Sequence, residues 1–262
     1  MTNAALHVAR TGLDAQNERM RVIANNLANV NTTGFKRDRA QFETLAYQSI
    51  TQPGAPSSAD NKYATGLNLG SGVAIKATSR ISTQGSVQQT ENALDFAIEG
   101  AGFFQITQPD GTTAYTRDGN FQRSAEGNIV TSDGMPLVPQ IQIPDGASAI
   151  TVGSDGTVSA TLQGQTAATE LGKLQIARFT NEDGLQAIGN NLLVETASSG
   201  APQIGDPGSD GRGTVRSGAL ESSNVNIVEE LVDMIETQRA YEVNSKLIKA
   251  TDEMLQTANQ QL

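Results

Sequence analysis

Both ends of the chain carry apolar residues at the seven-residue spacing of long helices that pack side by side. The pattern runs through residues 3–30 and again through 226–261, and its spacing is that of a coiled coil. At 1.5 Å per residue the two helices would reach about 40 and 54 Å. The residues expected at a helix interface, within one molecule or between copies, are Leu6, Leu13, Met20, Ile23, Leu27, Val30, Ile227, Leu231, Met234, Tyr241, Ile248 and Leu255.

Local signals set the limits of both helices. Thr2 or Asn3 can cap the first helix, and Gly34 follows its expected end near residue 30. Asn226, followed three residues later by Glu229, has the arrangement of a capping box at the start of the second. Because one helix leads into the middle of the chain and the other leads out, we expect an antiparallel pair.

The second helix has more apolar surface than one partner can cover. Its companion line, three or four residues from the main one, holds Leu231 but also Gln238, Ser245 and Asp252, while Leu247 and Met254 add apolar surface beside the stripe. Burial of such strips favours a bundle or tube of many copies. An ordinary helical hairpin within one molecule is the alternative.

The middle of the chain predicts β structure. Residues 31–70 indicate an irregular, extended arm, because Pro53 and Pro56 interrupt regular ladder bonding. Short apolar runs, such as those at 103–106 and 141–143, alternate with Asp-Gly pairs that are typical of hairpins. The predicted fold class is α+β, with a mainly antiparallel sandwich or open barrel. The predicted domains are a helical domain from 1–30 and 224–262, the arm at 31–70, and a β body at 71–223.

Composition excludes several classes of function. The net charge of −10 argues against nucleic acid. A cluster at Lys36, Arg37 and Arg39 is interpreted as a solvated turn, with an anionic docking patch as the alternative. His7 is the only histidine and cysteine is absent, so catalytic triads and the usual zinc sites are excluded. We expect no enzyme activity and no cofactor.

Two further expectations concern ions and membranes. Several Asp-Gly turns resemble oxygen-donor calcium loops, but no EF-hand spacing is met, so hairpin turns are favoured and no metal is expected. The chain shows neither a conventional signal peptide nor a run of about 20 apolar residues. We therefore expect no membrane insertion, and any export by a route that does not read such signals.

Asparagine is unusually frequent near the end of the first helix. It is a weak helix former, so its repetition suggests that the side-chain amides bond outside the helix. A solvated, fraying helix end is an equal alternative. The positions are Asn25, Asn26, Asn29 and Asn31.

Four stretches of the chain resemble the flagellar rod and hook family. They are GLDAQNERMRVIANNLANVNTTGFKRDRA at 12–40, LDFAIEGAGFFQI at 94–106, AYTRDGNFQRSAEGNIVTSDG at 114–134 and ESSNVNIVEELVDMIETQRAYEVNSKLIKATDEMLQ at 221–256. Their order is that of the family. The length and the region at 46–66 are more similar to distal rod members than to the longer hook members, and a proximal rod or hook-type axial protein is the alternative.

The resemblance implies a structural subunit of a hollow helical rod that transmits torque from motor to hook. It implies homo-oligomerisation, contact with proximal rod proteins, the hook protein and the peptidoglycan and outer-membrane bushing rings, and export by the flagellar type III apparatus to the basal body, where the rod crosses the periplasm. The implied ordered contacts of the family motif are made by Asn25, Asn26, Asn29, Asn31, Gly34 and Phe35, and the implied stiffening arm contains Tyr47, Pro53, Pro56 and Tyr63.

Two interpretations outside this family make different demands on the chain. A secreted β-rich binding module, such as an adhesin, would not need matched helices at both ends. An enzyme acting on cell-wall glycan would need two carboxylates facing one cleft.

Overall fold

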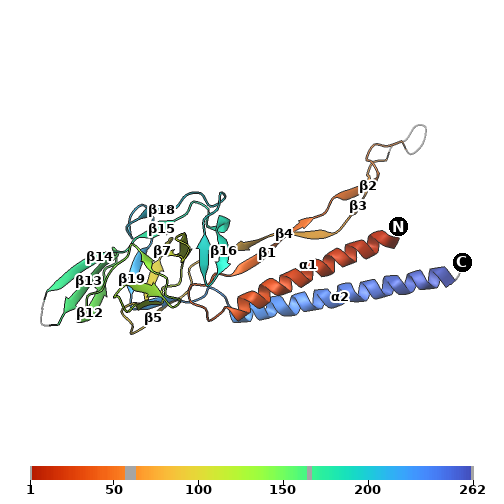
Figure 1. Cartoon of the computed structure of the whole chain (residues 1–262). Coiled ribbons are helices and arrows are strands. Elements are labelled where there is room, and N and C mark those ends of the chain that lie inside the picture. The colour runs from red at the N-terminus through yellow and green to blue at the C-terminus, as the bar shows by residue number, and fades with distance from the viewer. Residues whose placement is uncertain (1, 57–62, 164–166, 261–262) are drawn as a thin grey trace. The chain divides into compact units, whose positions relative to one another are not determined.

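The computed structural model describes residues 2–56, 63–163 and 167–260. They form two compact units (Figure 1). The first unit consists of Met1–Leu27, Asp38–Ser79 and Asn226–Leu262, and the second of Ala28–Arg37 and Arg80–Val225. The first unit thus combines the expected helices with most of the expected arm. The three-part division made from the sequence stays a prediction.

Two long antiparallel helices form the body of the first unit (Figure 1). They are α1, Thr2–Ala28, and α2, Ile227–Gln260. The Asn226 side chain caps α2 by accepting a hydrogen bond from the Val228 N–H at 3.0 Å. Both helices therefore begin and end within about two residues of the predicted limits, and the antiparallel prediction is confirmed.

The arm in the first unit is a pair of β ladders. β1, Asp38–Thr44, pairs with β4, Val73–Arg80, and β2, Tyr47–Thr51, pairs antiparallel with β3, Leu67–Gly70. The prediction of irregular chain was wrong here. Pro53 and Pro56 lie beyond the end of β2, so neither removes a hydrogen bond from the ladder.

The second unit is a mainly antiparallel β body. Within the described residues its largest sheet has seven strands in the order β16-β17-β8-β7-β15-β18, with β11 beside β7. Neighbouring strands in this sheet run antiparallel. The strands are β7 (Phe103–Thr107), β8 (Thr113–Thr116), β11 (Leu137–Val138), β15 (Ile176–Arg178), β16 (Gln186–Gly189), β17 (Leu192–Val194) and β18 (Gln203–Gly205).

Smaller sheets complete this body. One has three strands, β12-β13-β14, and the others are the pairs β9-β10, β6-β19 and β5-β20. The 3₁₀ helix η1 spans Glu182–Gly184. The strands are β5 (Val87–Gln89), β6 (Phe96–Glu99), β9 (Phe121–Arg123), β10 (Ile129–Thr131), β12 (Ala147–Val152), β13 (Thr157–Leu162), β14 (Ala168–Lys173), β19 (Thr214–Ser217) and β20 (Ala219–Glu221). These open antiparallel sheets with two helices confirm the α+β class.

Some strand and turn predictions failed locally. The Asp-Gly pairs at 110 and 155 join the paired strands β7-β8 and β12-β13, as expected of hairpins. Asp183 instead lies in η1, so its turn is helical. The predicted strand at Ile141–Ile143 is irregular chain between Pro139 and Pro144, although both isoleucines are buried.

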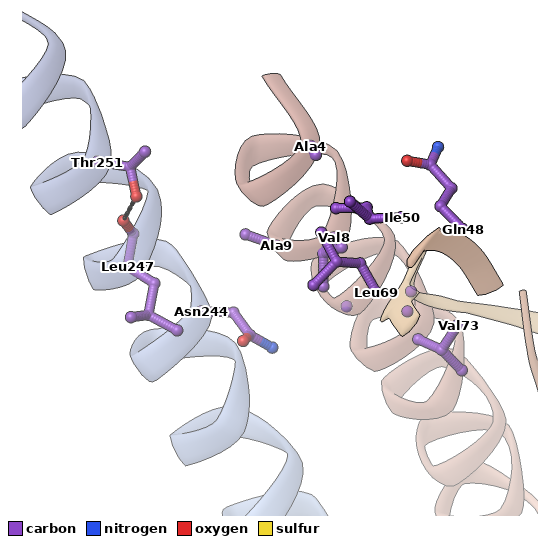
Figure 2. A pocket seen from close by; sticks show the side chains of 13 residues that line it. Ala4, Val8, Ala9, Gln48, Ile50, Leu69, Val73, Asn244, Leu247 and Thr251 are labelled. Atoms are coloured by element: carbon purple, nitrogen blue, oxygen red, sulfur yellow. Dashed lines mark hydrogen bonds between the residues drawn. The ribbon is translucent and has the colours of Figure 1, made fainter. Parts of the chain in front are cut away.

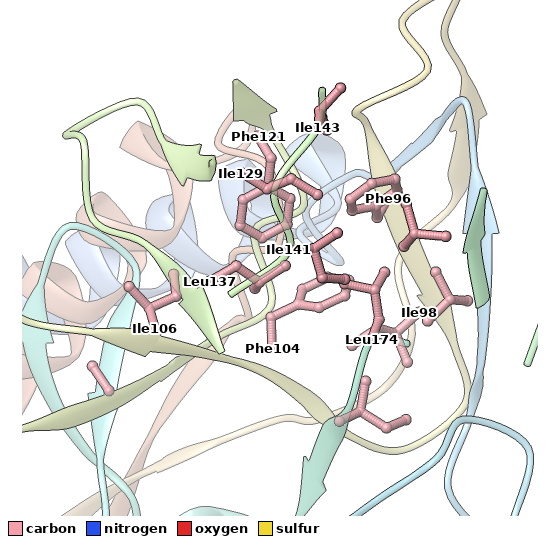
Figure 3. Packing of buried hydrophobic residues seen from close by; sticks show 14 of the residues in the cluster. Phe96, Ile98, Phe104, Ile106, Phe121, Ile129, Leu137, Ile141, Ile143 and Leu174 are labelled. Atoms are coloured by element: carbon pink, nitrogen blue, oxygen red, sulfur yellow. The ribbon is translucent and has the colours of Figure 1, made fainter. Parts of the chain in front are cut away.

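Three phenylalanines form the centre of the core in the second unit (Figure 3). The rings of Phe96 and Phe121 lie 5.7 Å apart between centroids, and those of Phe104 and Phe121 5.3 Å apart in an edge-on contact. Such pairs contribute about 0.5–1.5 kcal/mol each beyond area burial. Phe103, on the opposite face of β7, packs in a second cluster with Phe179. β7 is therefore buried on both faces.

Candidate assembly surface

The two helices of the first unit meet along a close seam. Arg19 Nη2 lies 3.3 Å from Asp233 Oδ1, and Asn26 Nδ2 donates to Glu230 Oε2 at 3.2 Å. Near the other end of the seam, a Cβ added to Gly12 would lie 3.2 Å from Asn244 Nδ2. The small residue at this position lets the two backbones approach.

The side of α2 that faces α1 carries a line of polar residues. Glu230 and Thr237 are fully buried, and Asn244 is half-buried seven residues further on. This polar line begins at Glu230, whereas the companion line expected from the sequence begins one residue later, at Leu231. The Leu231 side chain is 43% exposed. One residue turns a helix by about 100°, so the apolar residue lies away from the seam.

The structure places the predicted interface residues in three environments. In α1, Ile23 is buried, whereas Leu6, Leu13, Met20 and Leu27 are half-buried. Val30 lies after α1 in the second unit and is half-buried. In α2, Met234 and Ile248 are half-buried, Ile227, Leu231 and Tyr241 are exposed, and the Leu255 side chain lies outside the described residues.

A strip of exposed apolar residues runs along the face of α2 roughly opposite the polar line. We name it the outer strip. Its members follow one another at steps of three, four, seven or eight residues, and all fall within about 120° of the helix circumference. Sequence reasoning identified only Leu247 and Met254; the same periodicity could have found the rest. The outer strip consists of Val228, Val232, Ile235, Val243, Leu247 and Met254, between 50% and 70% exposed.

An open groove of about 1040 Å³ lies in the first unit among α1, α2 and the arm (Figure 2). The arm contacts α1 beside it: the Val73 N–H donates to Thr11 Oγ1 at 3.4 Å. Of the described residues that line the groove, none is charged. They are Ala4, Val8, Ala9, Gly12, Gln48, Ile50, Leu69, Gly70, Gly72, Val73, Asn244, Leu247 and Thr251.

The arm presents its aromatic side chains to solvent. Tyr47 is 63% and Tyr63 47% exposed, and Pro53 and Pro56 are exposed as well. Tyr63 is tied into the arm because its N–H donates to the Ala55 carbonyl at 2.9 Å. Residues 57–62 of the predicted stiffening arm lie outside the described residues.

The asparagines of the family motif differ in their surroundings. Asn26 is buried in the first unit, where its amide donates to the Asp38 carbonyl at 2.8 Å and accepts from the Asp38 N–H at 2.9 Å. Asn29 accepts a hydrogen bond from the Thr32 hydroxyl. Asn25 and Asn31 are exposed. Contacts of these residues with other subunits stay a prediction.

Gly34 and Phe35 lie in the second unit. The Gly34 N–H donates to the Glu221 carbonyl at 2.8 Å. Its φ is +69°, and a Cβ there would lie 2.7 Å from the Arg117 carbonyl carbon. Only glycine therefore fits this close approach. Phe35 is half-buried, and its N–H donates to the Thr32 carbonyl at 3.3 Å.

A buried ionic network in the second unit holds the segment at 28–37 to the β body. Glu221, on β20, is 1% exposed. One carboxylate oxygen lies 2.5 Å from Lys36 Nζ, and the other 2.7 Å from Arg117 Nε. The interpretation of Lys36 as part of a solvated turn was therefore wrong, because its amine is paired inside the protein.

Burial and charge pairing act in opposite directions on this network. Burial alone raises the pKa of the Glu221 carboxyl, but the neighbouring Arg117 and Lys36 outweigh it, so the pKa lies below the usual 4.5. For Lys36, burial dominates over the attraction of Glu221, and the pKa lies below 10.5. Glu221 is therefore ionised at neutral pH.

The described part of the chain holds neither a cluster of metal-ligating side chains nor a membrane-spanning helix. No group of three or more His, Cys, Asp or Glu side chains there is arranged to hold a metal ion. Neither helix, over its described residues, is long and apolar enough to cross a membrane.

Three family models match parts of the chain. The flagella basal body rod protein model matches residues 6–36, and the flagellar hook protein FlgE/F/G D1 domain model matches 97–160. The flagellar basal body rod FlgEFG protein C-terminal model matches 216–261. The matches include most of α1, part of the phenylalanine core and all of α2.

Full-length relatives carry the same description. The flagellar basal-body rod protein FlgG of Buchnera aphidicola subsp. Acyrthosiphon pisum is 49% identical over 98% of both chains. FlgG of Caulobacter vibrioides is 46% identical over 98% of both chains, whereas FlgF of the same organism is 34% identical over 98% of this chain and 97% of FlgF. The chain therefore belongs to the family of flagellar basal-body rod proteins, structural components of the bacterial flagellum.

Proposed function

We propose that this chain is a structural subunit of the distal flagellar rod, which polymerises into a hollow helical tube and transmits torque from the motor to the hook. The observation that carries the proposal is the outer strip of α2. In a single chain its apolar side chains are at least half exposed. In the proposed tube, α1 and α2 form the inner layer and the outer strip is covered by neighbouring copies.

The energetics favour many copies over a single pair. Burying an exposed apolar side chain contributes about 1–2 kcal/mol, whereas association costs about 4–15 kcal/mol in lost translational and rotational freedom. Several strips must therefore be covered together. A contact between different surfaces of identical chains repeats without closing, and this produces a helical polymer.

The proposal includes specific partners and a location. Proximal rod proteins adjoin one end of the tube and the hook protein the other, and the bushing rings of the peptidoglycan layer and outer membrane surround it. The chain reaches the basal body through the flagellar type III apparatus. The proposal assigns it no catalytic step, no cofactor, no metal and no insertion into a membrane.

The arm supplies stiffness in this proposal. The paired strands β2 and β3 form a ladder that exposes Tyr47, Ile50 and Leu69. Exposed apolar side chains on a narrow ladder are suited to contact with a neighbouring subunit. We assign these contacts, together with Pro53, Pro56 and Tyr63, to the layer outside the helices.

A proximal rod protein is the second candidate. The comparison within Caulobacter vibrioides favours the distal assignment, because its FlgG is 46% and its FlgF 34% identical to this chain.

The test is a charge placed in the outer strip. Ile235, half exposed, is changed to Asp, with Ile235→Leu as the matched apolar control. Basal bodies from cells that express each variant are examined by electron microscopy, and export of the chain is followed separately. Ile235→Asp should leave export intact and abolish the rod beyond its proximal part, whereas Ile235→Leu should support rods and swimming. Rods of normal length with Ile235→Asp would exclude the outer strip as a polymer contact.

A further inference from the structure

The outer strip is uncharged at its amino-terminal end and interrupted by charge further along. From Val228 to Ile235, the arc of α2 that holds Val228, Val232, Ile235 and the neighbouring Leu231 contains no charged side chain. Glu229 lies about 60° outside this arc, in line with Leu247. Arg239 and Lys246 lie within the same face further along α2. The four residues Val228, Leu231, Val232 and Ile235, all at least 43% exposed, are here named the docking patch.

The groove of the first unit has properties that match the docking patch. Its described lining is uncharged, and Figure 2 shows Val8, Leu69 and Leu247 contributed by α1, the arm and α2. The opposite side of α2 is buried against α1 at Glu230, so the side chains of the docking patch, and not the whole helix, would enter the groove of about 1040 Å³. The docking patch spans two turns of helix. If the charged part of the outer strip occupied the groove instead, Arg239 or Lys246 would be buried in an uncharged lining without solvent or an ionic partner.

The groove and the docking patch cannot meet within one chain. The groove lies beside residues 244–251 of α2 and the patch at 228–235, so their centres are separated by about 24 Å along one rigid helix. The two internal stretches outside the described residues do not offer an apolar occupant, because 57–62 reads SSADNK and 164–166 reads GQT.

We propose that the docking patch of one copy occupies the α1–α2–arm groove of a second copy. This inference rests on the proposed function and specifies which surfaces of two rod subunits meet. The two surfaces differ and point in different directions around α2, so the contact does not close into a two-fold dimer. Neighbours in contact are displaced by about 24 Å along the direction of α2.

Engineered cysteines test the proposal, because the chain contains none of its own. The double variant carries Val232→Cys in the docking patch and Val8→Cys in the groove, both at exposed positions. The matched control pairs Val8→Cys with Val243→Cys. Val243 lies on α2, as Val232 does, and the two valines have similar exposure. Rods are isolated from cells and treated with a short bismaleimide, and the products are separated by size under denaturing conditions.

The expected result is a ladder of multimers that consumes most of the monomer in the double variant, with little cross-linking in the control. Rods assembled from a mixture of Val232→Cys and Val8→Cys single variants should give dimers that contain one of each. Cross-linking of Val232→Cys alone to itself, or a ladder from the control but not from the double variant, would overturn the assignment of patch to groove. Rods would still form in that case, so the proposed function would survive.

Discussion

Replacing Glu221 by Gln should destabilise the second unit far more than breaking an exposed ion pair. The carboxylate is buried and lies within 2.7 Å of both Lys36 Nζ and Arg117 Nε. It also accepts a hydrogen bond from the Gly85 N–H at 3.0 Å. Glutamine keeps the shape but leaves two buried cations without a counter-charge. Removing one partner of a buried ionic network costs about 3–5 kcal/mol.

The matched control is Asp145→Asn. Asp145 contacts the Arg123 guanidinium, but its side chain is 99% exposed. Exposed pairs contribute about 0–1 kcal/mol, because solvent screens them. The control should therefore leave the free energy of unfolding nearly unchanged, although it also removes one carboxylate from the second unit.

Urea unfolding of the full chain, followed by circular dichroism, measures both effects. The Glu221→Gln variant should lose about 3–5 kcal/mol, which corresponds to a fall in Tm of roughly 6–20 °C for a unit of this size. A loss below about 1 kcal/mol, equal to that of Asp145→Asn, would refute the view that this network holds the segment at 28–37.

The difference in stability between the wild type and Glu221→Gln should depend on pH in a defined direction. The pKa of Glu221 is lower in the folded state than its usual 4.5, so the unfolded chain binds more protons in the interval between the two values. Stability from this group is therefore present above about pH 4.5 and is lost as the pH falls through the folded-state pKa. The difference between wild type and Glu221→Gln should shrink as the pH falls below 4.5. A difference that grows in acid would contradict the pairing.

Three further predictions concern the backbone, the helices and the arm. Gly34→Ala should lower the free energy of unfolding in urea by about 3 kcal/mol or more, because the added Cβ would lie 2.7 Å from the Arg117 backbone. Gly111→Ala, also at positive φ but in open space, should lower it by about 1–2 kcal/mol. Equal losses would argue against the close approach. Changing Leu27 and Ile248 together to Asp should abolish polymer while the β body keeps its circular dichroism, and filaments from this variant would exclude the helices as the polymer core. Deleting residues 46–66 should give rods that bend more easily in electron micrographs; straight, stiff rods would exclude the arm as the stiffening element.

The helices were predictable from sequence because their heptad spacing and caps are local signals. The seam itself was less visible. The line of α2 that meets α1 contains Glu230, Thr237 and Asn244, and a buried polar line gives no hydrophobic periodicity. A search for apolar stripes therefore finds the outward face of α2 as readily as the inward one.

The arm and the ionic network show a different limit. Pro53 and Pro56 do not prevent a ladder in the arm, because a proline interrupts a ladder only where the ladder runs, and β2 ends before both. Lys36 and Glu221 are separated by 185 residues. Their pairing depends on how β20 lies beside the segment at 28–37, and no local pattern contains that information. The family motifs include this segment, but only the folded structure shows what its lysine contacts.

The most direct test of the account is an electron cryomicroscopy reconstruction of the isolated rod that resolves the helices of individual subunits. The central claim is that the outer strip of α2 is covered by another copy of the chain. The account predicts α1 and α2 in the inner layer of the tube, with Val232 and Ile235 in contact with a neighbouring subunit. A rod in which these side chains face solvent, or in which α2 contacts only its own chain, would contradict it.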